Sequence, residues 1–373
     1  DSPLQHSWKT PEHEGCTEVY RSVFSVLKLK GNVLRFVFIT GITKFTQISL
    51  FSVLNHLTNI SFLPQFAPLC GITEEEMTVN FAPELEALAD KMECSIKEAH
   101  DKLKTYYDGY HFSDENMTDI YNPFSLLNAL SQLRLRNYWI SSGATSMLNK
   151  FVNNMELRLH DFEDCYIDKD TLETSDVIEG GAELFLYQTG YLTIKGFDED
   201  GYSLGFPNEE VRKALYKAVL PTLTQKDITD IISIQSWLMH SMNNGNLEEA
   251  KLCMKSLISN VPYSNKKLAS MDMEERYRLI ISTILNAIGC QVEVEHMLST
   301  GRIDIVASTS RFIYVVELKL SNNGGINAAE KQIIDNGYLK PFLADDRKVI
   351  GLAVELDDMG KGLIDWKEVQ NKQ

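Results

Sequence analysis

The sequence predicts an α/β protein, because apolar strand patterns alternate along the chain with segments of helical periodicity. Residues 35–40 (RFVFIT) form the first apolar strand pattern, and residues 50–57 continue with helical spacing. Residues 312–320 (FIYVVELKL) and 349–356 (VIGLAVEL) are two further apolar runs rich in β-branched residues. Such runs are typical of buried strands. The 373 residues are enough for two or three domains.

Shorter elements follow the first strand pattern. Asn122 before Pro123 indicates a helix start, since asparagine caps helices and proline suits the first helical position. Residues 190–194 and 202–208 predict two short strands around an Asp/Gly turn at residues 198–201, and a helix over residues 208–220 comes next.

The middle of the chain is predicted to be helical. Residues 231–242 are amphipathic, and residues 247–257 (LEEAKLCMKSL) have helical spacing with acids first and lysines later. Residues 261–267 (VPYSNKK) have the composition of a linker. We therefore predict a helical connector over residues 221–267.

The C-terminal region predicts a helix, three strands, a helix and a further strand. Residues 274–285 have helical spacing, and Gly289 is a suitable C-terminal stop. Residues 291–295 (QVEVE) alternate like a strand that enters a hairpin. Residues 328–338 predict the second helix.

Two acids and a lysine are expected to meet on this hairpin. Glu317 and Lys319 are two apart and point to one face of their strand. If residues 308–311 form the turn, Asp304 pairs opposite Val315, and its Cβ lies about 7–8 Å from that of Glu317. Two such carboxylates can hold one hard cation, which would activate a phosphodiester. The alternative is an ordinary hairpin with a Glu317–Lys319 salt bridge.

The pattern Asp…Glu-x-Lys across a hairpin resembles the core of the PD-(D/E)XK nucleases. Residues 274–366 resemble the branch found C-terminal to AAA-ATPase-like domains in bacterial proteins, through the motifs GRID (301–304), ELKL (317–320), QI (332–333), GY (337–338) and IDW (364–366). The resemblance implies an α/β restriction-endonuclease-like domain over residues 268–373. It implies Mg²⁺ or Mn²⁺ bound by Asp304 and Glu317, a catalytic Lys319, and support from Glu274 and Gln332.

Each supporting residue has a simpler interpretation as well. Glu274 is in a first helical turn, where acids favour the helix dipole, and Gln332 suits a helix surface. Tyr338 fits either the core or the site, and Arg302 either a phosphate contact or the hairpin. The family usually has a lysine where this chain has Asn336, and loss of that lysine would weaken nucleic-acid affinity.

The first 220 residues resemble an incomplete AAA-ATPase-like α/β domain with a helical, winged-helix-like region. The motifs that carry this resemblance are RFVFITG (35–41), YDGYHF (107–112), YNPF (121–124), YWISSG (138–143) and GYLTI (190–194). The resemblance implies that Thr40 is a polar sensor near a γ-phosphate. The alternative is a hydroxyl at a strand end that satisfies the backbone.

The phosphate-binding loop of such ATPases is missing from the sequence. No GxxxxGK[ST] motif occurs, and residues 1–6 (DSPLQH) resemble those that follow the family's Mg²⁺-binding acids. We therefore expect a fragment that does not itself bind ATP well, with ATP a cofactor only in a full-length parent.

Composition limits the remaining possibilities. The net charge is −16, which argues against strong non-specific binding of nucleic acid by the whole chain. Residues 268–373 hold only 12 Lys and Arg against 16 Asp and Glu, so most of the acidic excess lies upstream. Six scattered cysteines without CxxC spacing predict reduced thiols and a cytoplasmic protein. No apolar run is long enough for a membrane span.

These observations predict a metal-dependent nuclease, with DNA the expected substrate, coupled to an ATPase-like regulatory domain through which copies of the chain could assemble. The alternative is a catalytically idle nuclease fold that serves as an interaction module. The intact Asp304, Glu317 and Lys319 favour the enzyme, whereas the acidic balance and Asn336 favour the idle fold.

Overall fold

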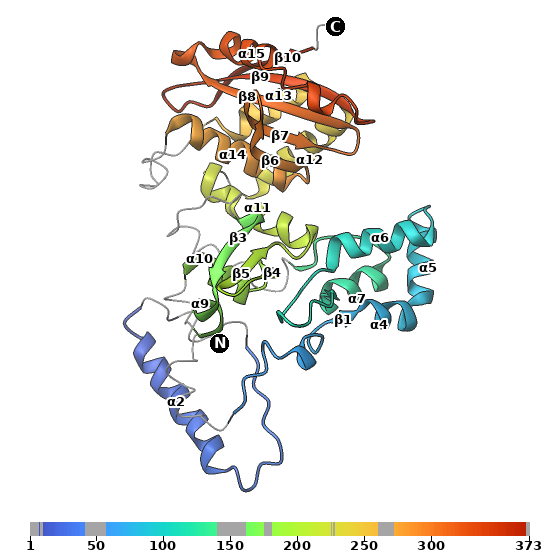
Figure 1. Cartoon of the computed structure of the whole chain (residues 1–373), viewed down its shortest axis with the longest axis vertical. Coiled ribbons are helices and arrows are strands. Elements are labelled where there is room, and N and C mark those ends of the chain that lie inside the picture. The colour runs from blue at the N-terminus through green and yellow to red at the C-terminus, as the bar shows by residue number, and fades with distance from the viewer. Residues whose placement is uncertain are drawn as a thin grey trace. The chain divides into compact units, whose positions relative to one another are not determined.

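The described residues of this computed structural model are 7, 10–41, 57–139, 162–174, 181–224, 226, 228–259 and 272–370. They divide into two compact units, and the boundary between the units lies between Arg212 and Lys213 within α11 (Glu209–Thr224). Figure 1 labels their elements. None of the described helices has the length and apolarity that a membrane span requires.

The first unit combines helices with two small antiparallel sheets. The sheets are β1–β2 and β3–β5–β4. Four of its helices, α4 to α7, form a group around one core, which contains Met77, Leu88, Leu103 and Leu126 (Figure 1). The elements of this unit are α2 (His13–Leu29), β1 (Ile72–Thr73), α4 (Glu74–Asn80), α5 (Ala82–Lys91), α6 (Ile96–Tyr107), β2 (Ile120–Tyr121), α7 (Pro123–Gln132), β3 (Cys165–Asp168), α9 (Lys169–Thr174), α10 (Gly181–Gln188), β4 (Thr193–Phe197) and β5 (Gly201–Gly205).

Local signals in this unit are confirmed where a side chain caps a helix or a turn joins two strands. The Asn122 side chain accepts the Ser125 N–H at the start of α7. The predicted hairpin is β4 and β5, joined through residues 198–200. Both signals act between residues close in sequence, which is why the sequence alone could reveal them.

The predicted buried strand at residues 35–40 is wrong. These residues are not a strand, and Phe36 and Phe38 are 79% and 52% exposed. Thr40, the predicted phosphate sensor, is exposed on this irregular segment. An apolar run forms a strand only where another strand pairs with it, and no described strand pairs with this one. The helical segment predicted at residues 50–57 lies, except for Leu57, outside the described residues.

The second unit contains a five-stranded sheet of order β10-β9-β8-β7-β6. Only β8 and β9 are parallel, and α15 lies between them in the chain. The predicted order of helix, three strands, helix and strand is confirmed, and β10 is an additional strand at the edge. The elements are α12 (Ile228–Asn244), α13 (Leu247–Leu257), α14 (Met273–Ala287), β6 (Gln291–Leu298), β7 (Gly301–Ser308), β8 (Phe312–Leu320), α15 (Gly325–Asp335), β9 (Lys348–Leu356) and β10 (Leu363–Val369).

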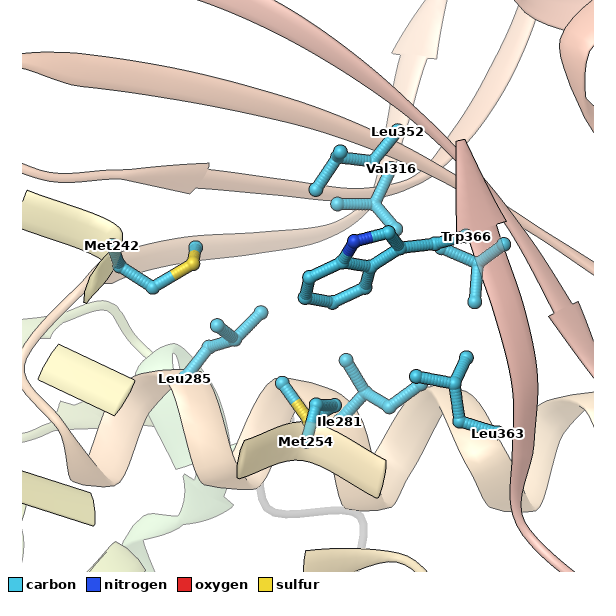
Figure 2. A pocket seen from close by; sticks show the side chains of 9 residues that line it. Met242, Met254, Ile281, Leu285, Val316, Leu352, Leu363 and Trp366 are labelled. Carbon is cyan, nitrogen blue, oxygen red and sulfur yellow. The ribbon is translucent and has the colours of Figure 1, made fainter. Parts of the chain in front are cut away.

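Helices cover both faces of this sheet. Val315 and Ala353 share a core with Ile333 of α15. Their strand neighbours Val316 and Leu352 point to the opposite face, because successive side chains alternate. There they line a small cavity of about 20 Å³ together with residues of α12, α13, α14 and β10 (Figure 2).

The structure places the predicted connector differently from the sequence. Met242 of α12 and Met254 of α13 line this same apolar cluster (Figure 2), and α13 contacts β10. The helices predicted as a separate connector therefore belong to the same compact unit as the sheet, and the described part of this unit begins at Lys213. The apolar stripes of these helices could be seen in the sequence, but the surface that they bury could not.

A polar cluster in the first unit surrounds the turn at residues 108–111. His111 Nε2 is 2.7 Å from Asp119 Oδ1, and its Nδ1 is 2.9 Å from the carbonyl oxygen of Ile194. Asp108 is only 2% exposed, and Lys104 Nζ lies 3.8 Å from its Oδ2. Burial, with a smaller contribution from the charge of Asp119, raises the pKa of Asp108 from its ordinary value of 3.8 to about 6.

We expect Asp108→Asn to stabilise the protein at pH 7 by on the order of 2 kcal/mol, since the variant buries no charge. The folded state binds a proton here at a pH where the unfolded state has lost it, so the free energy of unfolding falls as pH rises from about 4 to about 6. Thermal melts of both proteins from pH 4 to pH 8 would check this. The melting-temperature difference should grow between pH 4 and pH 6 and then stay constant, and a difference independent of pH would contradict it.

Candidate active site

The predicted site lies where the pairing of β7 with β8 ends. The last pairs of this ladder are Val306 with Val315 and Ile305 with Val316. The predicted register, in which Asp304 opposes Val315, is therefore wrong by two residues. The hairpin closes one residue later than predicted, since the Thr309 N–H donates to the carbonyl of Phe312 at 2.8 Å. Continued by one step, the observed register brings Asp304 level with Glu317.

Asp304 is buried and both of its carboxylate oxygens accept hydrogen bonds. Oδ2 accepts the backbone N–H of Leu318 at 2.9 Å, across the end of the ladder. Oδ1 accepts from Arg278 Nη1 of α14, also at 2.9 Å. The residue is 5% exposed, and a carboxylate this buried requires such partners.

Glu317 is 1% exposed and has one oxygen without a donor. Its Oε1 accepts from Lys319 Nζ at 2.8 Å, and the same ammonium donates to the Leu318 carbonyl at 2.9 Å. Its Oε2 is buried and accepts no hydrogen bond from the described residues. A buried carboxylate oxygen of this kind is unusual without a ligand or cation nearby.

The pKa values of Glu317, Glu274 and Lys319 are set by burial and by the charges that these side chains face. Burial, followed by the negative charge of Asp304, raises the pKa of Glu317 to about 7. Burial also raises the pKa of Glu274, against the attraction of Lys319. For Lys319, burial favours the neutral amine, but the hydrogen bond and charge of Glu317 outweigh it, and the pKa of the ammonium is raised. Lys319 is therefore a cation at neutral pH.

Glu274 reaches the same group from the first turn of α14. Its Oε1 is 3.7 Å from Lys319 Nζ, and its backbone N–H donates to the N-cap Asp272 at 3.1 Å. Glu274 and Arg278 are four residues apart, which places them on one face of the helix. One helical face thus contacts both Lys319 and Asp304.

Gln332 lies in a neighbouring cluster. Its Nε2 donates to the Tyr338 hydroxyl at 3.2 Å, as does Asn336 Nδ2 at 3.0 Å. The buried Tyr338 in turn donates to the carbonyl of Arg302 at 2.9 Å. A side chain at Gly301, where φ is +155°, would come within 2.7 Å of that hydroxyl. Among the described contacts, Gln332 bonds to none of Asp304, Glu317 and Lys319.

Two residues that connect these clusters, Arg278 and Glu295, were not among the predicted site residues. Arg278 Nη2 is 2.9 Å from Glu295 Oε1, and Arg302 Nη1 is 3.1 Å from the same oxygen. Glu295 adopts a φ of +57° inside β6 and stands level with Asp304 in the register. Arg278 follows Glu274 by four residues, and this spacing could have indicated that both side chains lie on one face of the helix. No feature of the sequence indicates the positive φ of Glu295.

The residues present fit one hard divalent cation. No group of three or more His, Cys, Asp or Glu side chains with metal-binding geometry occurs in the described part of the chain. Asp304 and Glu317 still supply two carboxylates, and Glu317 Oε2 has an open lone pair. Mg²⁺ commonly takes one or two carboxylates and keeps several waters, so two side chains are enough.

Comparison with known proteins identifies the part of the chain that holds this site. The family model of the PD-(D/E)XK nuclease superfamily matches residues 272–366. These residues form a PD-(D/E)XK nuclease superfamily domain, which includes every contact of Asp304, Glu317 and Lys319 described above.

The whole chain also has a curated relative. It is 26% identical over 377 residues to the "Uncharacterized protein in vnfD 5'region" of Azotobacter chroococcum mcd 1, and the match covers 95% of this chain and 70% of that protein. No solved structure is significantly similar to the chain. Neither match gives evidence for an ATPase-like domain in residues 1–220.

Proposed function

We propose that the domain at residues 272–366 is a divalent-metal-dependent phosphodiesterase that cleaves nucleic acid, with DNA the expected substrate. The observation that carries the proposal is the pair of buried acids Asp304 and Glu317, with Lys319 beside them and one open carboxylate oxygen. Asp304 and Glu317 would hold Mg²⁺ or Mn²⁺, which would polarise the phosphodiester and activate a water.

Lys319, Glu274 and Gln332 would have separate roles at this site. Lys319 carries a positive charge next to the carboxylates and can stabilise the negative charge that develops on the phosphate oxygens. Glu274, 3.7 Å from Lys319 Nζ, orients that ammonium. Gln332 would support the site indirectly, through Tyr338 and the backbone of Arg302.

The charge of the site suits a phosphodiester only after a cation has bound. Its acids are Glu274, Glu295, Asp304 and Glu317, and its bases are Arg278, Arg302 and Lys319. With all of them ionised the group carries one net negative charge, which repels a phosphate. A divalent cation would reverse that sign and attract one phosphodiester.

Digestion of plasmid, single-stranded DNA and RNA side by side would test the proposal. We expect cleavage with Mg²⁺ or Mn²⁺ and none with EDTA, and DNA should be cut in preference to RNA. Absence of cleavage of all three substrates by a protein that binds Mn²⁺ would contradict it. Cleavage of RNA alone would be consistent with the proposed mechanism but would show that the substrate is RNA rather than DNA.

One observation favours the alternative of an idle nuclease fold used for assembly. Arg278 and Lys319 already neutralise Asp304 and Glu317 without a metal. Calorimetric titration with Mn²⁺ separates the alternatives, since an idle site that is satisfied by its own cations should bind none. Coupling to an ATPase-like domain that binds ATP rests on the resemblance of residues 1–220 alone. The exposed position of Thr40 does not support it.

A further inference from the structure

We propose that Arg278 is a positioning residue that holds Asp304 in the metal-free site and is displaced from it when a divalent cation binds. This inference rests on the proposed nuclease function. It adds a competition between an internal cation and the metal for a single oxygen, Asp304 Oδ1.

The guanidinium of Arg278 bridges two strands. Nη1 contacts Asp304 Oδ1 of β7 and Nη2 contacts Glu295 Oε1 of β6, each at 2.9 Å. Its side chain is largely buried, with 12% exposed. A planar guanidinium that contacts two carboxylates is held more firmly than a lysine ammonium would be.

The other oxygen of Asp304 cannot easily serve a cation. Oδ2 accepts the Leu318 N–H, in the position where the backbone ladder has ended. We therefore expect a cation to bind Oδ1, the oxygen that also accepts from Arg278. Two cations on one buried oxygen repel each other strongly at low dielectric, so metal binding should move the guanidinium away.

Glu295 provides a place for Arg278 after its displacement. Its Oε1 would keep the contact with Nη2, and the Glu295 side chain is 36% exposed. Loss of the Asp304 contact therefore does not leave the arginine unpaired. The metal-free domain keeps its buried carboxylate neutralised, which an unpaired Asp304 would not be.

Mn²⁺ calorimetry of Arg278→Gln tests the competition. If the arginine holds Asp304 about nine-tenths of the time, removing it should tighten Mn²⁺ binding about tenfold. Arg347→Gln is the matched control, because Arg347 makes a comparable pair with Asp345 at 2.8 Å in the same unit. The control should bind Mn²⁺ as the unchanged protein does. Unchanged or weaker binding by Arg278→Gln would overturn the inference, as would an equal gain in the control.

Thermal melts provide a second measurement that does not depend on binding heat. Metal-free Arg278→Gln should melt at a lower temperature than the unchanged protein. Saturating Mn²⁺ should raise the melting temperature of the variant by more than it raises that of the unchanged protein. An equal or smaller rise would overturn the inference. If Arg278→Gln fails to fold, Arg278→Lys is the second variant to measure. It keeps the positive charge but lacks the planar guanidinium that contacts both carboxylates, and it should still bind Mn²⁺ more tightly than the unchanged protein. Weaker binding by Arg278→Lys would show that the arginine helps the metal.

Asp304→Asn separates this inference from the proposed function. If the unchanged protein binds Mn²⁺ and Asp304→Asn binds it equally well, the proposed metal site is wrong. If Asp304→Asn loses Mn²⁺ but Arg278→Gln gains no affinity, the metal site stands and only the competition fails.

Discussion

Replacing Asp304 by asparagine should abolish divalent-metal binding and reduce cleavage by about three orders of magnitude, since a metal supplies several kcal/mol of transition-state stabilisation. The substitution leaves an oxygen that can still accept the Leu318 N–H, which Asp304 Oδ2 accepts at 2.9 Å. It removes the charge that a hard cation requires. Calorimetry with Mn²⁺ and a metal-dependent plasmid assay would measure the two effects.

Fold integrity is checked on the same samples. The variant should melt close to the unchanged protein in the absence of metal, because it keeps the cross-strand bond and loses the repulsion between Asp304 and Glu317. Asp365→Asn is a suitable control, since Asp365 pairs with Lys251 at 2.9 Å on β10, outside the site. Mn²⁺ affinity or cleavage that survives in Asp304→Asn would show that the metal, if any, binds elsewhere.

Two neighbouring strands of the C-terminal sheet were predictable because they are apolar along most of their length. The run predicted at residues 312–320 is β8 itself, and that at 349–356 is β9 but for one residue. Strands covered by helices on both faces carry this continuous pattern. The run at residues 35–40 is also apolar but is mostly exposed. A pattern in one segment cannot show whether another segment will pair with it.

The site was only partly predictable for a related reason. Charged residues inside apolar strands are conspicuous, so Asp304, Glu317 and Lys319 could be selected from the sequence. Their register depended on which residue closes the hairpin, and a turn one residue later shifted each partner by two. Arg278 and Glu295 belong to a helix and a strand with many charged neighbours, and only the fold brings them to Asp304.

Replacing Lys319 by methionine should separate metal binding from chemistry. Methionine keeps an unbranched apolar side chain of similar length and removes the ammonium that donates to Glu317 Oε1 at 2.8 Å. Cleavage should fall about 10²–10³-fold, the usual cost of one electrostatic stabiliser. Mn²⁺ affinity should stay the same or increase, because Glu317 loses a competing cation.

The same two measurements would show whether Lys319 has only a structural role. Lys367→Met is the matched control, since Lys367 pairs with Glu330 at 2.7 Å at the surface of the same compact unit, and it should cleave normally. If Lys319→Met lost Mn²⁺ binding and cleavage together, the ammonium would be holding Glu317 in place. If it kept both, Lys319 would be only the partner of a buried acid, and the group of Asp304, Glu317 and Lys319 would lose its catalytic cation. Retained binding with lost cleavage is the result that a nuclease requires, because the charge on Lys319 is then needed only as the phosphate reacts.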